Sequence, residues 1–427
     1  MNKIFDRLTR AFLIVLPFNV IISVFFQFKL NLGIVSVYKE VFILALLGVL
    51  IYDKIKTRAK FVFDKLDYAV FLYVGYLILI SAINLISIKA FIYGARYDFE
   101  FLLLFMIFKH GSYMLQEKLS YYIKIFLISG GSAILIGSAI RFAIGEIVLT
   151  HIGFSSTLSS WNSGQSVPIY HGIEGANIRR FQGIFDGPNQ AAFFILTYIG
   201  LLFHYLKNRK EYYFYLFFGT FFLLGLIFLT YSRSSLLGVV IGVFFVCAVN
   251  LKTIFKKHKT LLVLFLVFMT LIGGIFYLKY STNISNIILR SGSTKGHSER
   301  MIIGFNQFLN KPFGKGLASS GPAYRLSHDT KGTDEKNFIP ESWYVQQLVE
   351  GGFIGFFFFM AILGLIFLRL YSVSIFFAGS FIAVLVMNSL LHTFEAVYIS
   401  LIFFMFLGMF LNSGKFKNKR KQLGKLQ

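Results

Sequence analysis

The sequence predicts an all-α, polytopic membrane protein, and three observations support this. Of the 427 residues, 56% are hydrophobic and only 14% are charged, a balance far from that of ordinary soluble domains. Apolar runs of about 20 residues, the length needed to cross a bilayer as a helix, recur along the chain. Lysine and arginine gather in alternate connections between these runs, as in the cytoplasmic loops of membrane proteins. We find no linker or repeat, so residues 1–427 are expected to form one domain.

The apolar runs predict about twelve transmembrane helices. Their expected positions are 11–26, 35–51, 68–88, 91–108, 121–145, 191–206, 212–229, 234–249, 261–278, 344–368, 372–390 and 394–411. If the N-terminus is cytoplasmic, the lysine-rich connections and the basic tail 412–427 also lie in the cytoplasm, and both ends are inside. The first run lacks a small-residue cleavage site and is expected to remain as a span.

The composition also excludes several kinds of site. The net charge of +23 is explained by cytoplasmic loops, so nucleic acid is not an expected partner. Cys247 is the only cysteine, which rules out a disulfide framework and a cysteine metal site. There is no Walker loop and no HExxH motif, and no cofactor is expected.

Two long connections, 146–190 and 279–343, fall outside the cell by this topology. Loops of this length without a span of their own are usually functional, and residues 298–309 can form a short helix lying on the bundle. The first loop ends in a polar, turn-forming and doubly basic stretch, 177–190, which contains Arg179 and Arg180 and leads directly into an apolar helix. In so hydrophobic a chain this stretch is expected to lie at the membrane surface and to present arginine to an anionic group.

Six side chains are expected to converge at this outer face: Arg180, Arg233, Arg300, Glu341, His392 and Glu395. Arginines around a pocket suit a diphosphate, because each planar guanidinium binds phosphate oxygens bidentately. A carboxylate or an imidazole suits a general base, and Glu341 is preferred over His392. The alternatives remain open: each arginine as a headgroup anchor, Glu341 as an acid near a helix start, and His392 as an ordinary interfacial residue.

The fourth predicted span carries Arg96, Asp98 and Glu100, and charges at membrane depth are candidates for function. Arg96 and Glu100 are four residues apart, a spacing that allows them to neutralise each other. Asp98 and Glu100 have the spacing of an acidic metal motif. They offer too few oxygen ligands and point to different faces of a helix, so no metal site is predicted.

An ordered set of motifs resembles the O-antigen polymerase/ligase family. It comprises Arg180-Phe181-x-Gly183-x-Phe185-x-x-Pro188-Asn189 before a span, a Ser232-Arg233-Ser234 turn, Arg300 followed by Pro312-x-Gly314-x-Gly316, and Glu350-Gly351-Gly352-Phe353-Ile354-Gly355 in a late span. The spacing of Arg300 and Gly316 fits an Arg-x15-Gly pattern of such polymerases. The motifs cover roughly residues 96–355.

The resemblance implies a metal-independent membrane glycosyltransferase of the GT-C type in a bacterial inner membrane, with its site facing the periplasm. Polymerases transfer a growing glycan from polyprenyl diphosphate onto a lipid-linked repeat unit, whereas ligases transfer it to lipid A core. The matched positions imply that Arg180 and Arg233 hold the diphosphate, with Arg96, Arg179, Arg300, Asn189 and His392 as further substrate-binding candidates. Ligases typically carry a histidine just before the late span, where this chain has Glu341, so polymerase is favoured. Lipid-linked oligosaccharide is the implied substrate, and a chain-length regulator and a flippase are candidate partners.

Two readings from other classes compete. A lipid-linked oligosaccharide flippase or another transporter also commonly has about twelve spans, but it places its polar residues near the bilayer midplane in broken helices. Here the charges concentrate at the outer ends and in the two long loops. A non-catalytic assembly factor is the remaining alternative.

Overall fold

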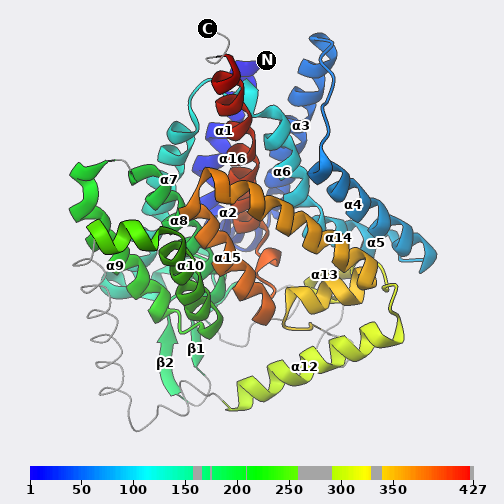
Figure 1. Ribbon diagram of the computed structural model, residues 1–427. Coiled ribbons are helices and arrows are strands. Elements are labelled where there is room, and N and C mark those ends of the chain that lie inside the picture. The colour runs from blue at the N-terminus through cyan, green and yellow to red at the C-terminus, as the bar shows by residue number, and fades with distance from the viewer. Residues whose placement is uncertain (157–165, 174–175, 208, 258–290, 328–338, 424–427) are drawn as a thin grey trace.

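The computed structural model describes the chain except for residues 157–165, 174–175, 208, 258–290, 328–338 and 424–427. The described part is a bundle of helices, in which α1 begins and α16 ends at one end, while β1, β2 and α12 lie at the other (Figure 1). The helices of the first half are α1 (Asn2–Val15), α2 (Asn19–Val24), α3 (Tyr38–Lys56), α4 (Lys65–Ile83), α5 (Ile88–Asp98), α6 (Glu100–Gly111), α7 (Leu119–Ala139) and α8 (Pro188–Leu206). Those of the second half are α9 (Tyr213–Leu229), α10 (Arg233–Lys257), α12 (Ser291–Asn310), α13 (Gly321–Ser327), α14 (Trp343–Val373), α15 (Ile375–Leu390) and α16 (Val397–Leu423).

The all-α, polytopic membrane fold is confirmed. Among the described residues, six helical stretches are long and apolar enough to cross a membrane, and four shorter helices are strongly apolar. Each predicted span except 261–278 coincides with a helix or a helix pair, and 261–278 lies outside the described residues.

Three of the spans are interrupted. The first continues from α1 through a 3₁₀ turn at Leu16–Phe18, where Pro17 supplies no amide hydrogen. The fourth predicted span divides into α5 and α6 on either side of Phe99. Helix α14 bends at Gly352, whose φ of 60° and ψ of −165° are non-helical and are accessible in practice only to glycine.

Small residues allow the closest helix contacts. At the α10–α15 interface, a Cβ atom on Gly238 would lie 2.5 Å from the carbonyl oxygen of Ala383. At the α6–α16 interface, a Cβ atom on Gly408 would lie 2.6 Å from the carbonyl oxygen of Phe105. Such approaches are typical of membrane helices, where association depends on van der Waals packing. They fix the scaffold that carries the outer connections.

The first long connection is more ordered than expected. Its second half forms an antiparallel pair of strands, β1 (His171–Ile173) and β2 (Ala176–Arg180), in which His171 pairs with Arg180. Because the amide of Phe181 then donates to the carbonyl of Leu229 at 2.7 Å, the stretch expected to be a turn begins as a strand fixed to the end of α9. A 3₁₀ helix, η6 (Glu146–Ile152), precedes the strands.

The second long connection contains two helices. The predicted short helix at 298–309 is confirmed as part of α12, and α13 follows it before the bundle resumes with α14. Between α15 and α16 lies a 3₁₀ turn, η10 (Thr393–Glu395). Residues 279–290 and 328–338 of this connection lie outside the described residues, so the two helices are those of its described part.

Candidate functional site

A first group of side chains connects β2 with the turn between α9 and α10. Arg180 donates from Nε to the carbonyl oxygen of Thr230 at 2.7 Å and from Nη2 to Oδ1 of Asn189 at 3.1 Å. Arg233 is exposed and is the first residue of α10, three positions after Thr230. The structure therefore brings Arg180 and Asn189 to the turn that carries Arg233.

Arg179 lies in a different environment from its neighbour. Successive side chains of a strand point to opposite faces, and Arg179 is directed to Glu146, with Nη1 3.2 Å from Oε2. Arg141 binds the other oxygen of the same carboxylate at 3.2 Å. Burial raises the pKa of Glu146, and the two arginines counteract only part of that effect. A substrate-binding role for Arg179 remains a prediction.

A second group lies where α12 meets the start of α14. Glu341 stands two residues before α14 with a φ of 55°, and its carboxylate forms an ion pair with Arg300. His297, one helical turn before Arg300, places Nδ1 3.1 Å from Oε2 of Glu341. Burial acts to raise the pKa of Glu341, but His297, His392 and Arg300 outweigh it and lower that pKa to about 2. Glu341 is therefore an ionised carboxylate that anchors Arg300 and contacts His297.

His392 and Glu395 extend this group onto η10. Nε2 of His392 lies 3.5 Å from Oε2 of Glu395, and the histidine side chain is 24% exposed while the glutamate side chain is 4% exposed. Burial lowers the pKa of His392 and raises that of Glu395 well above its ordinary value. At neutral pH the imidazole is therefore uncharged; part of the ring is exposed, whereas Nδ1 is buried. Asn388 fixes the turn, because its Oδ1 accepts from the hydroxyl of Thr393 and the amide of Phe394.

Backbone contacts hold the two parts of the second group together. The amide of Trp343 donates to the carbonyl of Leu391 at 3.0 Å, which joins the start of α14 to the residue before His392. Arg325 on α13 completes the group, since its electrostatic neighbours are Arg300, Glu341 and Glu395.

Arg96 belongs to a third group, on α3 and α5. Its Nε lies 2.7 Å from Oε1 of Glu40, so Glu40 is its direct ion-pair partner, and Glu100 interacts with Arg96 as a nearby charge. The reason is the break at Phe99, which ends α5 and places Glu100 on another helix. Asp98 accepts a hydrogen bond from Gln347 of α14 at 2.8 Å. Helix α5, which carries Arg96, packs against α13 and η10 of the second group, although Arg96 itself pairs with Glu40.

His297 and Arg325 are functional candidates that the sequence analysis missed. His297 precedes Arg300 by three positions on a helix, and that spacing is a signal that both share one side of it. No comparable signal marks Arg325. In the described part of the chain, no three His, Cys, Asp or Glu residues are arranged to hold a metal ion.

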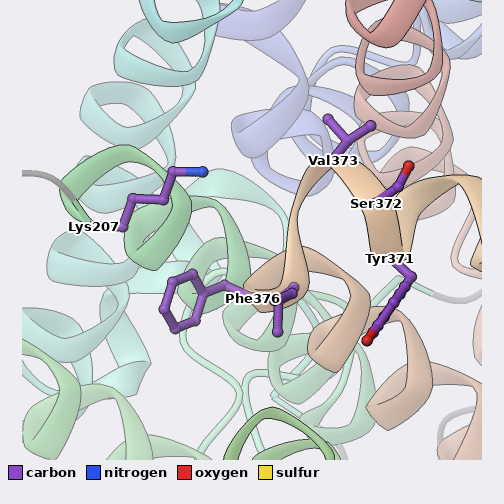
Figure 2. A pocket seen from close by; sticks show the side chains of 6 residues that line it. Lys207, Tyr371, Ser372, Val373 and Phe376 are labelled. Carbon is purple, nitrogen blue, oxygen red and sulfur yellow. The ribbon is translucent and has the colours of Figure 1, made fainter. Parts of the chain in front are cut away.

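A cavity of about 170 Å³ lies elsewhere. It is lined by Lys207, Tyr371, Ser372, Val373, Ile375 and Phe376, around the α14–α15 turn and just beyond α8 (Figure 2). Helix α8 runs from Pro188, near Arg180, to Leu206, so this cavity is about the length of a helix away from the first group. It does not belong to the candidate site.

Comparison with known proteins supports the family suggested by the motifs. Residues 218–360, about a third of the chain, match the family model described as O-antigen ligase. The matched region includes Arg233, Arg300 and Glu341, whereas Arg180 and His392 lie outside it. No significant match was found among curated proteins. The match does not distinguish polymerases from ligases. Residues 218–360 of this multi-pass membrane protein are thus similar to the O-antigen ligase family, which agrees with the motifs.

Proposed function

We propose that the protein is a polymerase that transfers a growing glycan from polyprenyl diphosphate onto the sugar of a second lipid-linked repeat unit. The observation that carries the proposal is the second group, in which Arg300, Glu341 and His392 meet at the end of the bundle opposite the start of α1. Lys54 and Lys56 lie in the last turn of α3 and Arg58 follows just after it, and the positive-inside rule assigns that side to the cytoplasm. The candidate site then faces the periplasm of a bacterial inner membrane.

The arginines suit the leaving diphosphate. The side chain of Arg300 is 57% exposed, so a diphosphate can compete with Glu341 for its guanidinium. As the bond between the sugar C1 and the diphosphate oxygen breaks, the electron pair stays on that oxygen. Fixed positive charge stabilises the negative charge that develops on that oxygen, and such electrostatic stabilisation is often the largest contribution to catalysis. No cofactor or metal ion enters the proposal.

His392 is better suited than Glu341 to accept the proton from the attacking sugar hydroxyl. A general base works best when its pKa is near the operating pH, and Arg300 and His297 hold the pKa of Glu341 at about 2. His392 is neutral at pH 7 and retains access from outside. The acceptor oxygen forms a bond to C1, its proton passes to the imidazole, and the ionised Glu341, an electrostatic neighbour of His392, stabilises the resulting imidazolium. Glu341 is proposed to orient Arg300 and His297.

A polymerase must bind two polyprenyl diphosphates at the same time, and the chain offers two cationic groups at the outer end. Arg180 and Arg233 form one beside α8, and Arg300 with Arg325 forms the other beside α14. The turn η10 contacts α8, α14 and α16 and so lies beside both groups. This pairing favours a polymerase over a ligase, whose acceptor is lipid A core.

The test is the surface glycan of a deletion strain complemented with single variants and resolved as a ladder. For Arg300→Ala and His392→Ala we expect core carrying one repeat unit, because ligation continues while polymerisation stops. His151→Ala is the matched control, since this histidine is exposed on η6 at the same end, and it should give a normal ladder. Bare core with polymer retained on the lipid carrier would indicate a ligase instead. Normal ladders from both site variants would refute the proposed site.

A further inference from the structure

Helix α12 has an unusual distribution of side chains. Ile302, Phe305 and Leu309 follow one another at helical spacing and are 59%, 46% and 58% exposed. His297 and Arg300 lie on another side of the helix and are directed to Glu341. On a helix at the surface of a soluble protein, the apolar side is ordinarily packed against the rest of the protein. On α12 the apolar side is exposed instead.

The C-terminal end of α12 lies at membrane depth. Immediately after the helix, the carbonyl of Pro312 accepts from the amide of Phe353, and the ring of Phe313 packs on that of Phe353 with centroids 5.3 Å apart. Phe353 is ten residues beyond the first residue of α14, roughly 15 Å along the helix. The hydroxyl of Tyr76, inside the span formed by α4, donates to the carbonyl of Phe313 at 2.6 Å. The chain after α12 is therefore attached to two spanning helices below their outer ends.

The open apolar side continues onto surfaces that face lipid. Phe313 is 56% exposed, and its partner Phe353 is 48% exposed on α14. The α4–α5 connection, joined to this segment by a hydrogen bond from Lys311 to Asn84, exposes 89% of Leu85. Figure 1 shows the C-terminal end of α12 on the same side of the bundle as α4, α5 and α14. The residues left open on α12 thus extend the lipid-facing belt of the bundle.

We propose that α12 is an interfacial helix whose C-terminal half is embedded in the outer leaflet through Ile302, Phe305 and Leu309. Its N-terminal half is polar, with His297, Ser298 and Glu299, and remains in the water and headgroup layer. Such a division between a polar and an apolar part is typical of helices that lie in the interface. The lipid then fixes the depth and the rotation of α12, and with them the positions of Arg300 and His297. These two side chains are held at the level of the lipid headgroups.

Single cysteines on a Cys247→Ser background test the embedding in proteoliposomes. Ile302→Cys, Phe305→Cys and Leu309→Cys are compared with Ser298→Cys, which lies one turn earlier on the same side and is exposed. We expect a polar maleimide to label position 298 at least tenfold faster than the other three, and all four to be labelled completely after unfolding. A bimane attached at 305 should be quenched by lipids brominated on their acyl chains, and a bimane at 298 should not.

Two outcomes would overturn the proposal. Equal labelling rates at 298, 302, 305 and 309 would show that the apolar side is in water. Slow labelling at 305 without quenching by brominated lipid would show that protein, either a partner or a second copy of this chain, covers it. Both readouts concern the position of the helix and are independent of the glycosyl transfer activity.

Discussion

Gly352→Ala tests the junction on which the α12–α14 contact depends. The φ of 60° and ψ of −165° at this position lie in a region that residues with a Cβ atom rarely adopt. An added Cβ atom would also lie 2.3 Å from the carbonyl oxygen of Pro312 and 2.3 Å from the carbonyl carbon of Phe313. Both contacts are with backbone, so no side-chain rotation relieves them.

The expected loss of stability follows from these two effects. Backbone strain of this kind costs about 1–3 kcal/mol, and overpacking a tight contact costs about 1–3 kcal/mol. The free energy of unfolding is expected to decrease by roughly 2–6 kcal/mol unless the segment after α12 detaches from α14. Detachment would release Phe313 from Phe353 and move Arg300, so glycan polymerisation should fall as well.

The measurement is the temperature at which half of the detergent-solubilised protein remains monodisperse in size-exclusion chromatography, together with the glycan ladder. Gly364→Ala is the matched control on the same helix, because an added Cβ atom there meets nothing within 4 Å. We expect Gly352→Ala to lose many degrees of thermal stability and Gly364→Ala to behave as the wild type. If the two variants were equally stable, the bend at Gly352 would not be a fixed feature of the fold.

Three further predictions concern single side chains. If His392 is the base, the initial rate in vitro should fall towards acid pH with a midpoint below the ordinary histidine value of about 6.5, since burial lowers the pKa of that imidazole. A midpoint above that value would contradict this assignment. Burial raises the pKa of Asp186 to about 6, so the stability that protonated Asp186 contributes is complete below the pKa of the unfolded chain and is lost as the pH rises through 6. Asp186→Asn should therefore raise the melting temperature at pH 7.5 but not at pH 4. An equal shift at both pH values would refute this. Arg180→Lys should lower polymer yield, because one ammonium group cannot reach both Thr230 and Asn189 as the guanidinium does. The expected decrease is roughly tenfold, the equivalent of one charge-assisted hydrogen bond of about 1.5 kcal/mol. Full activity would indicate that Arg180 is only an anchor.

The spans were predictable because bilayer thickness imposes a length and an apolar composition on each. What the sequence did not indicate are the interruptions inside them. The break at Phe99 has no proline or glycine to mark it, and it decides that Arg96 pairs with Glu40 rather than with Glu100. The strand at Ala176–Arg180 was also missed, since its partner β1 is only three residues long and carries too short a pattern to be recognised.

The sequence predicted which residues form the candidate site better than it predicted which of them contact one another. Charged side chains at the outer ends of spans are conspicuous in an apolar sequence, and Arg300, Glu341 and His392 were identified for that reason. Their mutual arrangement depends on a contact between α12 and the start of α14, which are separated by more than thirty residues of chain. That contact turns Glu341 from a candidate base into a partner of Arg300, because a neighbouring guanidinium stabilises the ionised carboxylate.

Strained backbone conformations also lie in the connections, the part of the fold that the sequence predicted least well. Six described residues with a side chain have φ values between 50° and 56°, a conformation that costs about 1–3 kcal/mol for most residues: Asn31, Arg58, Leu85, Tyr231, Ala318 and Glu341. All six lie in connections between helices, and Tyr231 and Glu341 lie near the candidate site, before Arg233 and beside Arg300. Rigid packing of the helices can hold such conformations. Strain of this kind persists where function requires a side chain at that point. A substitution of Glu341 therefore changes both charge and backbone preference, and Glu341→Gln is the variant that isolates the charge.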